Sequence, residues 1–224
     1  MKVLISDDVA KAFEGLHLGF LEIREMKIAQ ESEKVTELLR ETSGKVCSGL
    51  TIETVKDRAD FRAYRDFFWK QGVDPTKIRP ASEALVRRIL KGSSIPRIND
   101  FVDAYNLASI ETGVPIAAFD LDALDEDIVL RFSAEGEQFL GIGMVGAKAL
   151  GKGTLIMSSG DEVVAMYPYR DADASRITTD TTGALVVSCG VPGIAQETLL
   201  DAANRARDHI ISVCGGHPSK IGAV

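Results

Sequence analysis

The sequence predicts an α+β fold with antiparallel or mixed sheets. Four helix-like segments follow one another between residues 32 and 112, and six short strand-like runs follow them between residues 116 and 189. In a parallel α/β sheet, helices and strands would alternate instead. The chain has 224 residues, no internal repeat and no long linker, so we expect residues 1–224 to form a single domain.

Apolar residues spaced three to four positions apart predict the helices. The clearest stripe contains Phe61, Tyr64 and Phe68. Pro80 suits the first turn of the next helix, and Gly113 suits a helix end. The expected helices span residues 32–41, 59–71, 80–91, 100–112 and 195–213.

Short runs of apolar and β-branched residues, bounded by glycines and acidic residues, predict the strands. Two precede the helices and six follow them. The expected strands span residues 2–6, 16–28, 116–119, 128–132, 138–141, 154–157, 162–167 and 184–189.

The composition is that of a globular protein, with 45% apolar and 26% charged residues. It excludes a disordered chain and a disulfide-dense scaffold. No apolar run approaches the roughly 20 residues needed to cross a bilayer, and the N-terminus turns acidic too early for a secretory signal. Three cysteines without paired spacing indicate reduced thiols in a cytoplasmic protein. Cys214 and His217 offer only two ligands, so we expect no metal site.

The net charge is −7, but its distribution is uneven. Residues 56–97 contain 11 basic and 5 acidic residues. Such a segment can attract a polyanion, or it can be an ordinary solvated helix face. We expect Trp69 to be half-buried core, with base stacking as the alternative. The predicted RNA-binding residues of this segment are Arg62, Arg65, Arg87 and Arg88.

Two glycine-rich patterns resemble nucleotide-binding loops, but the residues around them do not meet the requirements of such a loop. Residues 141–146 match G-x-G-x-x-G, but no helix of adequate length follows to receive a pyrophosphate. Residues 146–153 approach a phosphate loop, but Gly153 stands where Ser or Thr would bind magnesium. We therefore expect turns between strands and no cofactor.

A more specific pattern lies between residues 96 and 143. It contains V-D-A-Y-N at Val102–Asn106, G-V-P-I-A-A-F-D at Gly113–Asp120, a strand ending in Arg at Ile128–Arg131 and E-G-E at Glu135–Glu137. This order resembles the B3/B4 region of the phenylalanyl-tRNA synthetase β subunit. The resemblance implies a mixed α+β domain whose sheets frame a pocket, with residues 1–55 as an extension packed on it.

In that family the domain hydrolyses tyrosine wrongly esterified to the tRNA for phenylalanine. The resemblance therefore implies tRNA or aminoacyl-tRNA as the partner. The anticodon, catalytic and assembly modules of a synthetase have no room in 224 residues. The chain resembles a free-standing copy of the domain, not a complete synthetase.

The pocket positions depart from the family pattern. Ala117 stands where the family has a His, and the strand at 184–188 lacks the Glu that reads the tyrosine hydroxyl. A site distinguishes tyrosine from phenylalanine by a buried acceptor for the phenol hydroxyl, because a polar group buried without a partner is costly. Since this sequence lacks that acceptor, tyrosine editing of the usual kind is not expected. Asn106 matches a family pocket position, and Tyr105 would narrow the pocket.

A polar segment from residue 167 to 182 replaces a glycine-rich stretch of the family. Arg170 and Asp171 directly follow an apolar strand and can bind a ligand's phosphate or carboxylate and its amine, respectively. A solvated loop built of Asp and Thr turns is the alternative. The residues predicted to contact a ligand are Tyr105, Asn106, Ala117, Tyr169, Arg170, Asp171, Ser175 and Thr179.

Two functions remain open. The first is a tRNA-binding protein that hydrolyses a mischarged aminoacyl-tRNA in trans, with a water positioned by the site and no protein nucleophile. The second is a non-catalytic module of the same fold that binds RNA or a small amino-acid-like ligand. The sequence assigns no catalytic residue, because its three histidines lie outside the matched region and no Ser-His-Asp set is present.

Overall fold

Two five-stranded sheets form the centre of the molecule in the computed structural model, which describes residues 1–224. The strands are β1 Val3–Ile5, β2 Leu18–Arg24, β3 Ile116–Asp120, β4 Ile128–Phe132, β5 Gln138–Phe139, β6 Lys148–Ala149, β7 Leu155–Ser159, β8 Glu162–Met166, β9 Arg170–Asp171, β10 Ala184–Cys189, β11 His217–Pro218 and β12 Gly222–Ala223.

One sheet has the order β1-β4-β7-β8-β9, and the other has the order β11-β2-β10-β3 with β12 also paired to β2. The β1–β4 pair is parallel, and every other named pair is antiparallel. The predicted α+β fold with mixed or antiparallel sheets is therefore confirmed. β1 and β2 place the N-terminal segment in both sheets.

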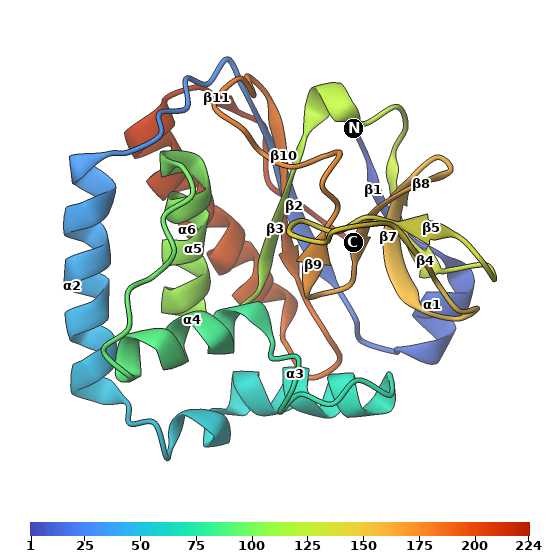
Figure 1. Cartoon of the computed structure of the whole chain (residues 1–224), viewed down its shortest axis with the longest axis horizontal. Coiled ribbons are helices and arrows are strands. Elements are labelled where there is room, and N and C mark those ends of the chain that lie inside the picture. Colours follow the sequence, from blue (N-terminus) through green and yellow to red (C-terminus); the bar gives the residue numbers. More distant parts are fainter.

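The helices lie mainly on one side of the second sheet (Figure 1). α5 and α6 cover that sheet, α2 and α4 pack outside them, and α3 crosses one end of the molecule. The helices are α1 Asp7–Ala12, α2 Glu33–Gly49, α3 Ala59–Lys70, α4 Ala81–Leu90, α5 Asp100–Thr112 and α6 Gln196–Cys214, with short 3-10 turns at Val55–Asp57 and Leu121–Ala123.

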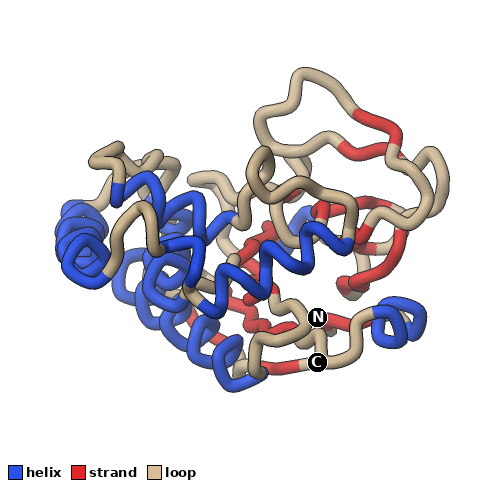
Figure 2. The backbone as a smooth tube through the Cα atoms, turned by 90° about the horizontal axis from the view of Figure 1, so that it is seen from below, coloured by secondary structure: helices blue, strands red, loops and turns tan.

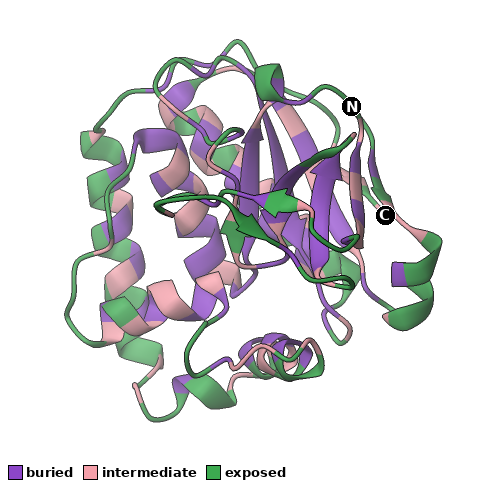
Figure 3. Ribbon diagram, turned by 45° about the vertical axis from the view of Figure 1, so that its right-hand side comes forward, coloured by how far each residue is buried: buried purple, intermediate pink, exposed green.

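β10 is the centre of the core. All six of its residues are buried, because α6 covers one face and the other sheet covers the second (Figure 3). Its two neighbours are β2 and β3, which enclose it on both edges. Burial on both faces explains its uninterrupted apolar sequence.

α5 begins and ends where its local sequence dictates. The Asn99 side chain accepts a hydrogen bond from the Val102 amide at 2.9 Å, and Gly113 ends the helix with φ 77°. α5 packs against α6 and β3, so its inner face is fixed against the sheet. This placement directs Tyr105 and Asn106 toward the space between the two sheets.

The segment at 141–146 forms turns between β5 and β6, in a hairpin that projects from the sheets (Figure 2). No helix follows Gly143, which has φ 78° in a turn. Gly141 is closely surrounded: a Cβ there would lie 2.5 Å from the Arg170 Cδ atom and 2.8 Å from Cε1 of the buried Phe139 ring. The glycines of this motif therefore serve the hairpin and its contact with β9.

Candidate functional site

A small cavity lies where the edge strands of the two sheets meet. It has a volume of about 150 Å³ and is enclosed by β9 of one sheet, β3 of the other, and α5. The turn between β8 and β9 closes one side. Its lining residues are Ala81, Tyr105, Asn106, Pro115, Ile116, Ala117, Met157, Ala165, Met166, Tyr167, Pro168, Tyr169, Arg170, Asp171 and Cys189.

Two polar side chains of this lining have no hydrogen-bond partner in the protein, and a third, a carboxylate, has no ion-pair partner. The Asn106 amide and the Tyr105 hydroxyl make no hydrogen bond to another residue, and the Asp171 carboxylate forms no ion pair. None of their polar atoms is sealed from solvent. A few polar groups that converge in a largely apolar cavity are the arrangement that orients a ligand, so this concentration marks a candidate ligand site.

Asp171 is the electrostatic centre of the cavity. Burial raises the pKa of its carboxyl group from the ordinary 3.8 to about 7, and a hydrogen bond from the Ala118 amide lowers it only in part. The preceding residue, Arg170, does not compensate the charge. Its side chain is exposed, and it donates to the Ile142 carbonyl at 3.2 Å. Asp171 therefore changes charge near neutral pH.

The other titratable groups of the cavity stay neutral near pH 7. Burial raises the pKa of Tyr105 and of the Cys189 thiol, and the charge of Asp171 raises both further. Burial also raises the pKa of Tyr167 and Tyr169. Cys189 is consequently a thiol and a poor nucleophile. The cavity can donate from Asn106 and Tyr105, and it holds one carboxyl group.

Six of the eight residues predicted to contact a ligand line this one cavity: Tyr105, Asn106, Ala117, Tyr169, Arg170 and Asp171. Ser175 and Thr179 lie outside its lining. Ser175 is buried, its carbonyl accepts from the Asp120 amide at 3.0 Å, and its hydroxyl has no partner. Thr179 is exposed on the same loop.

Sequence reasoning missed the apolar walls, which include Met157, Met166 and Cys189. These residues belong to strands β7, β8 and β10, whose apolar runs predict burial but not which side chains face a cavity. Of the lining residues that were missed, only Tyr167 and Pro168 could have been predicted from the sequence, because they lie just before Arg170, which was predicted to contact a ligand.

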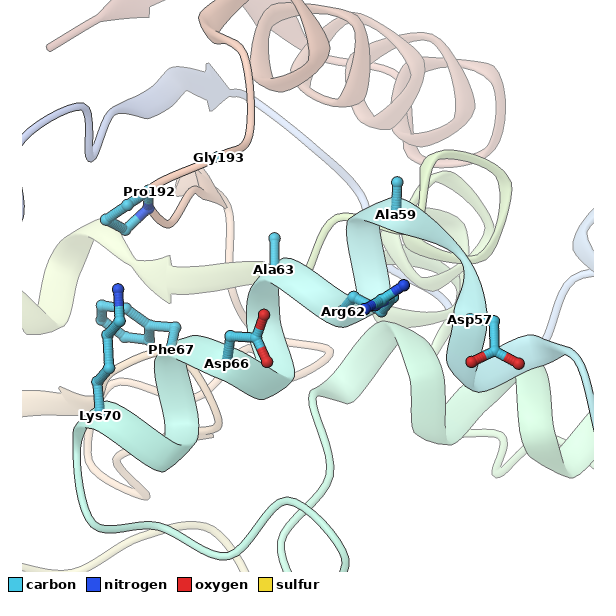
Figure 4. Close-up of a pocket in the computed structure, with 9 residues that line it drawn as sticks. All are labelled: Asp57, Ala59, Arg62, Ala63, Asp66, Phe67, Lys70, Pro192 and Gly193. Carbon is cyan, nitrogen blue, oxygen red and sulfur yellow. The ribbon is translucent and has the colours of Figure 1, made fainter.

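A larger groove of about 440 Å³ runs along α3 beside the Pro192–Gly193 turn (Figure 4). Asp57, Arg62, Asp66 and Lys70 line it, so its two basic charges are matched by two acidic ones. The groove therefore has no net charge to favour an anion. It lacks the concentrated, unpartnered polar groups of the smaller cavity.

The four predicted RNA-binding arginines lie in different environments. Glu83, fully buried on α4, binds Arg65 at 3.1 Å and Arg87 at 2.6 Å. Arg62 is exposed, and exposed Arg88 donates to the Ser94 carbonyl at 3.0 Å. The expectation of a half-buried Trp69 is wrong: its exposed fraction is 56%, because it lies on the face of α3 opposite the core.

The comparison with known families decides the classification. The family model of the B3/4 domain matches residues 63–215, which is more than half of the chain. This chain belongs to the B3/4 domain family. The match includes α5, β3, β8, β9 and β10, the elements that enclose the cavity.

The relatives of this B3/4 domain are β subunits of phenylalanine–tRNA ligase. The protein from Salinibacter ruber is 29% identical over 77% of this chain and 20% of its own length. Those from Yersinia pestis and Geobacter sulfurreducens are 26% and 34% identical over 62% and 50% of this chain, and over 17% and 14% of their own lengths. The chain thus matches a fifth or less of these relatives.

A solved structure has the same fold. An N-terminal fragment of the phenylalanyl-tRNA synthetase β subunit from Pyrococcus horikoshii superposes with a TM-score of 0.50 at 13% identity. The superposition covers 97% of this chain and 50% of the fragment. None of the six helices described above is both long and apolar enough to span a membrane. No cluster of three or more His, Cys, Asp or Glu side chains is placed to hold a metal ion.

Asp171→Asn should stabilise the B3/4 domain at pH 8 and leave it nearly unchanged at pH 4. The pKa in the folded state, about 7, exceeds the ordinary 3.8, so the folded protein binds more protons between these values. Stability therefore falls as the pH rises through this window, and an amide at this position avoids the loss. Urea unfolding at both pH values should show a gain of about 4 kcal/mol at pH 8 only, since each unit of pKa difference is worth about 1.4 kcal/mol. An equal effect at both values would contradict the assignment.

Proposed function

We propose that this B3/4 domain binds aminoacyl-tRNA and hydrolyses the ester of a mischarged one in trans. The main support is the cavity, which collects Tyr105, Asn106 and Asp171 from α5 and β9 without pairing them to other side chains. Membership in a family whose relatives are phenylalanine–tRNA ligase β subunits supports a partner related to tRNA.

Water is the nucleophile in this proposal. Cys189 is held as a thiol by burial, which raises its pKa, and no histidine lines the cavity. Ester hydrolysis needs a placed water and donors to the oxyanion, rather than a protein nucleophile. The Asn106 amide and the Tyr105 hydroxyl, whose high pKa keeps it protonated, are side-chain donors of the lining that make no hydrogen bond within the protein.

The pocket differs from one that recognises tyrosine. Ala117 provides no polar group, and the buried residues of β10 carry no carboxylate. Asp171, from β9, is the only carboxylate in the lining. The proposed substrate is therefore an aminoacyl group other than tyrosine. The second candidate is a non-catalytic module that binds the same ligand, and it is favoured by the absence of a polar group at Ala117.

Deacylation of a panel of mischarged tRNAs tests the proposal, with release of free amino acid as the readout. At least one member of the panel should be hydrolysed faster than in buffer, and Asn106→Ala should lower that rate by about 10²-fold because it removes an oxyanion donor. Asn204→Ala is the matched control, since its amide donates to the Leu200 carbonyl within α6. Binding without hydrolysis would select the non-catalytic module. If the protein neither bound nor hydrolysed any member of the panel, both candidates would be refuted.

RNA binding should depend on the exposed arginines. Arg62→Glu and Arg88→Glu should each weaken tRNA binding and reduce the slope of log K against log salt by about one, if each neutralises one phosphate. Lys220→Glu, in the turn between β11 and β12, is the control. Arg65 and Arg87 are unsuitable for this test, because removing either leaves buried Glu83 underpaired and costs stability. Unchanged salt slopes would remove α3 and α4 from the interface.

A further inference from the structure

We infer that the cavity binds a primary ammonium group on Asp171, with an apolar side chain of the same ligand against the methionine and tyrosine walls. This inference rests on the proposed function and specifies its substrate: an apolar aminoacyl group recognised by its free amine. In this inference Asp171 binds the amine, while Asn106 and Tyr105 place the water and donate hydrogen bonds to the oxyanion.

The charge inside the cavity favours a cationic ligand. Asp171 and Arg170 are the only charged residues of the lining, and the Arg170 side chain is exposed and bound to the Ile142 carbonyl in the hairpin. Adjacent residues of a strand point to opposite faces, which explains this separation. The carboxylate therefore has a single amide donor, from Ala118, and no cation. A charged hydrogen bond from an ammonium group is the interaction that would best compensate it.

The walls limit the rest of the ligand to an apolar group of moderate size. Met157, Met166, Ile116 and Pro115 offer no charge and no strong donor. The volume of about 150 Å³ matches that of an engineered apolar cavity that accommodates benzene. Side chains such as those of methionine, leucine or phenylalanine meet this limit. A charged side chain would have no partner there.

The pH dependence of binding follows from one titration in the protein. Besides Asp171, the titratable groups that face the cavity are Tyr105 from α5, Cys189 from β10, and Tyr167 and Tyr169 from the turn, and burial raises the pKa of all four. They stay neutral below pH 8. Asp103, behind Tyr105, is paired with Arg97 at 2.5 Å. Binding should therefore weaken below the Asp171 midpoint, and again above about pH 8, where the amine of the ligand loses its proton.

Titration calorimetry with phenylalaninamide and its des-amino analogue, hydrocinnamamide, tests this inference on the full chain. Both probes lack the carboxylate of a free amino acid, as an ester does. At about pH 7.5, phenylalaninamide should bind at least about tenfold more tightly, the value of one charge-assisted hydrogen bond. At about pH 6, where the amine of the ligand is already protonated and Asp171 is mostly neutral, binding should release protons, because Asp171 must be ionised in the complex. Methioninamide and leucinamide serve as alternative side chains.

Asp171→Asn should remove the preference for the amine, and Asp180→Asn, an exposed residue of the same loop, should retain it. Since Asp171→Asn is expected to be more stable than the parent at this pH, lost binding would not reflect unfolding. Equal binding of the two amides, or no binding of any amine, would overturn the inference. If a tRNA were deacylated but phenylalaninamide and hydrocinnamamide bound equally well, the proposed function would stand and the inference about the amine would not. If amines bound through Asp171 but no tRNA were hydrolysed, the inference would stand for a ligand-binding module.

Discussion

The carboxyl group of Asp171 lies at the junction of two sheets without a cation beside it, and the properties of the cavity follow from that arrangement. Burial raises its pKa to about 7, and burial together with the charge of Asp171 raises the pKa of Tyr105 and Cys189. A core that served stability alone would replace such a group by an apolar one or pair it. Its retention is typical of a binding site, where stability is exchanged for recognition.

The fold makes this site from parts that are far apart in the chain. β10 orders the second sheet and places β3 at its edge, while β8 delivers β9 to the edge of the first sheet. The Ala118 amide of β3 then reaches Asp171 of β9, 53 positions later. α5, fixed by the Asn99 cap and Gly113, brings Asn106 to the same space. The cavity thus depends on the packing of the two sheets rather than on one loop.

The sequence predicts the α+β class, the strong amphipathic helices and six of the cavity residues, because stripes, caps and directly adjacent motifs carry local signals. The sequence does not predict the features that are determined by packing between distant segments. α2 continues to Gly49 past Ser43 and Gly44, since Leu39 and Val46 pack against the neighbouring helices. β9 is two residues long and has no periodicity to detect. Trp69 lies on the face of α3 opposite the apolar stripe and is exposed, although a large aromatic residue is usually partly buried. Met157 and Met166 line the cavity only because the two sheets meet there.

The titration of Asp171 measures the central constraint directly. Carbon-13 NMR of aspartate-labelled protein, assigned with Asp171→Asn, should show a carboxyl signal with a midpoint near pH 7. Saturation with an amine ligand should lower that midpoint, because the cation favours the charged form. A midpoint near the ordinary aspartate value of about 4, unchanged by ligand, would mean that the carboxylate is already solvated or paired, and the account of this cavity would be wrong.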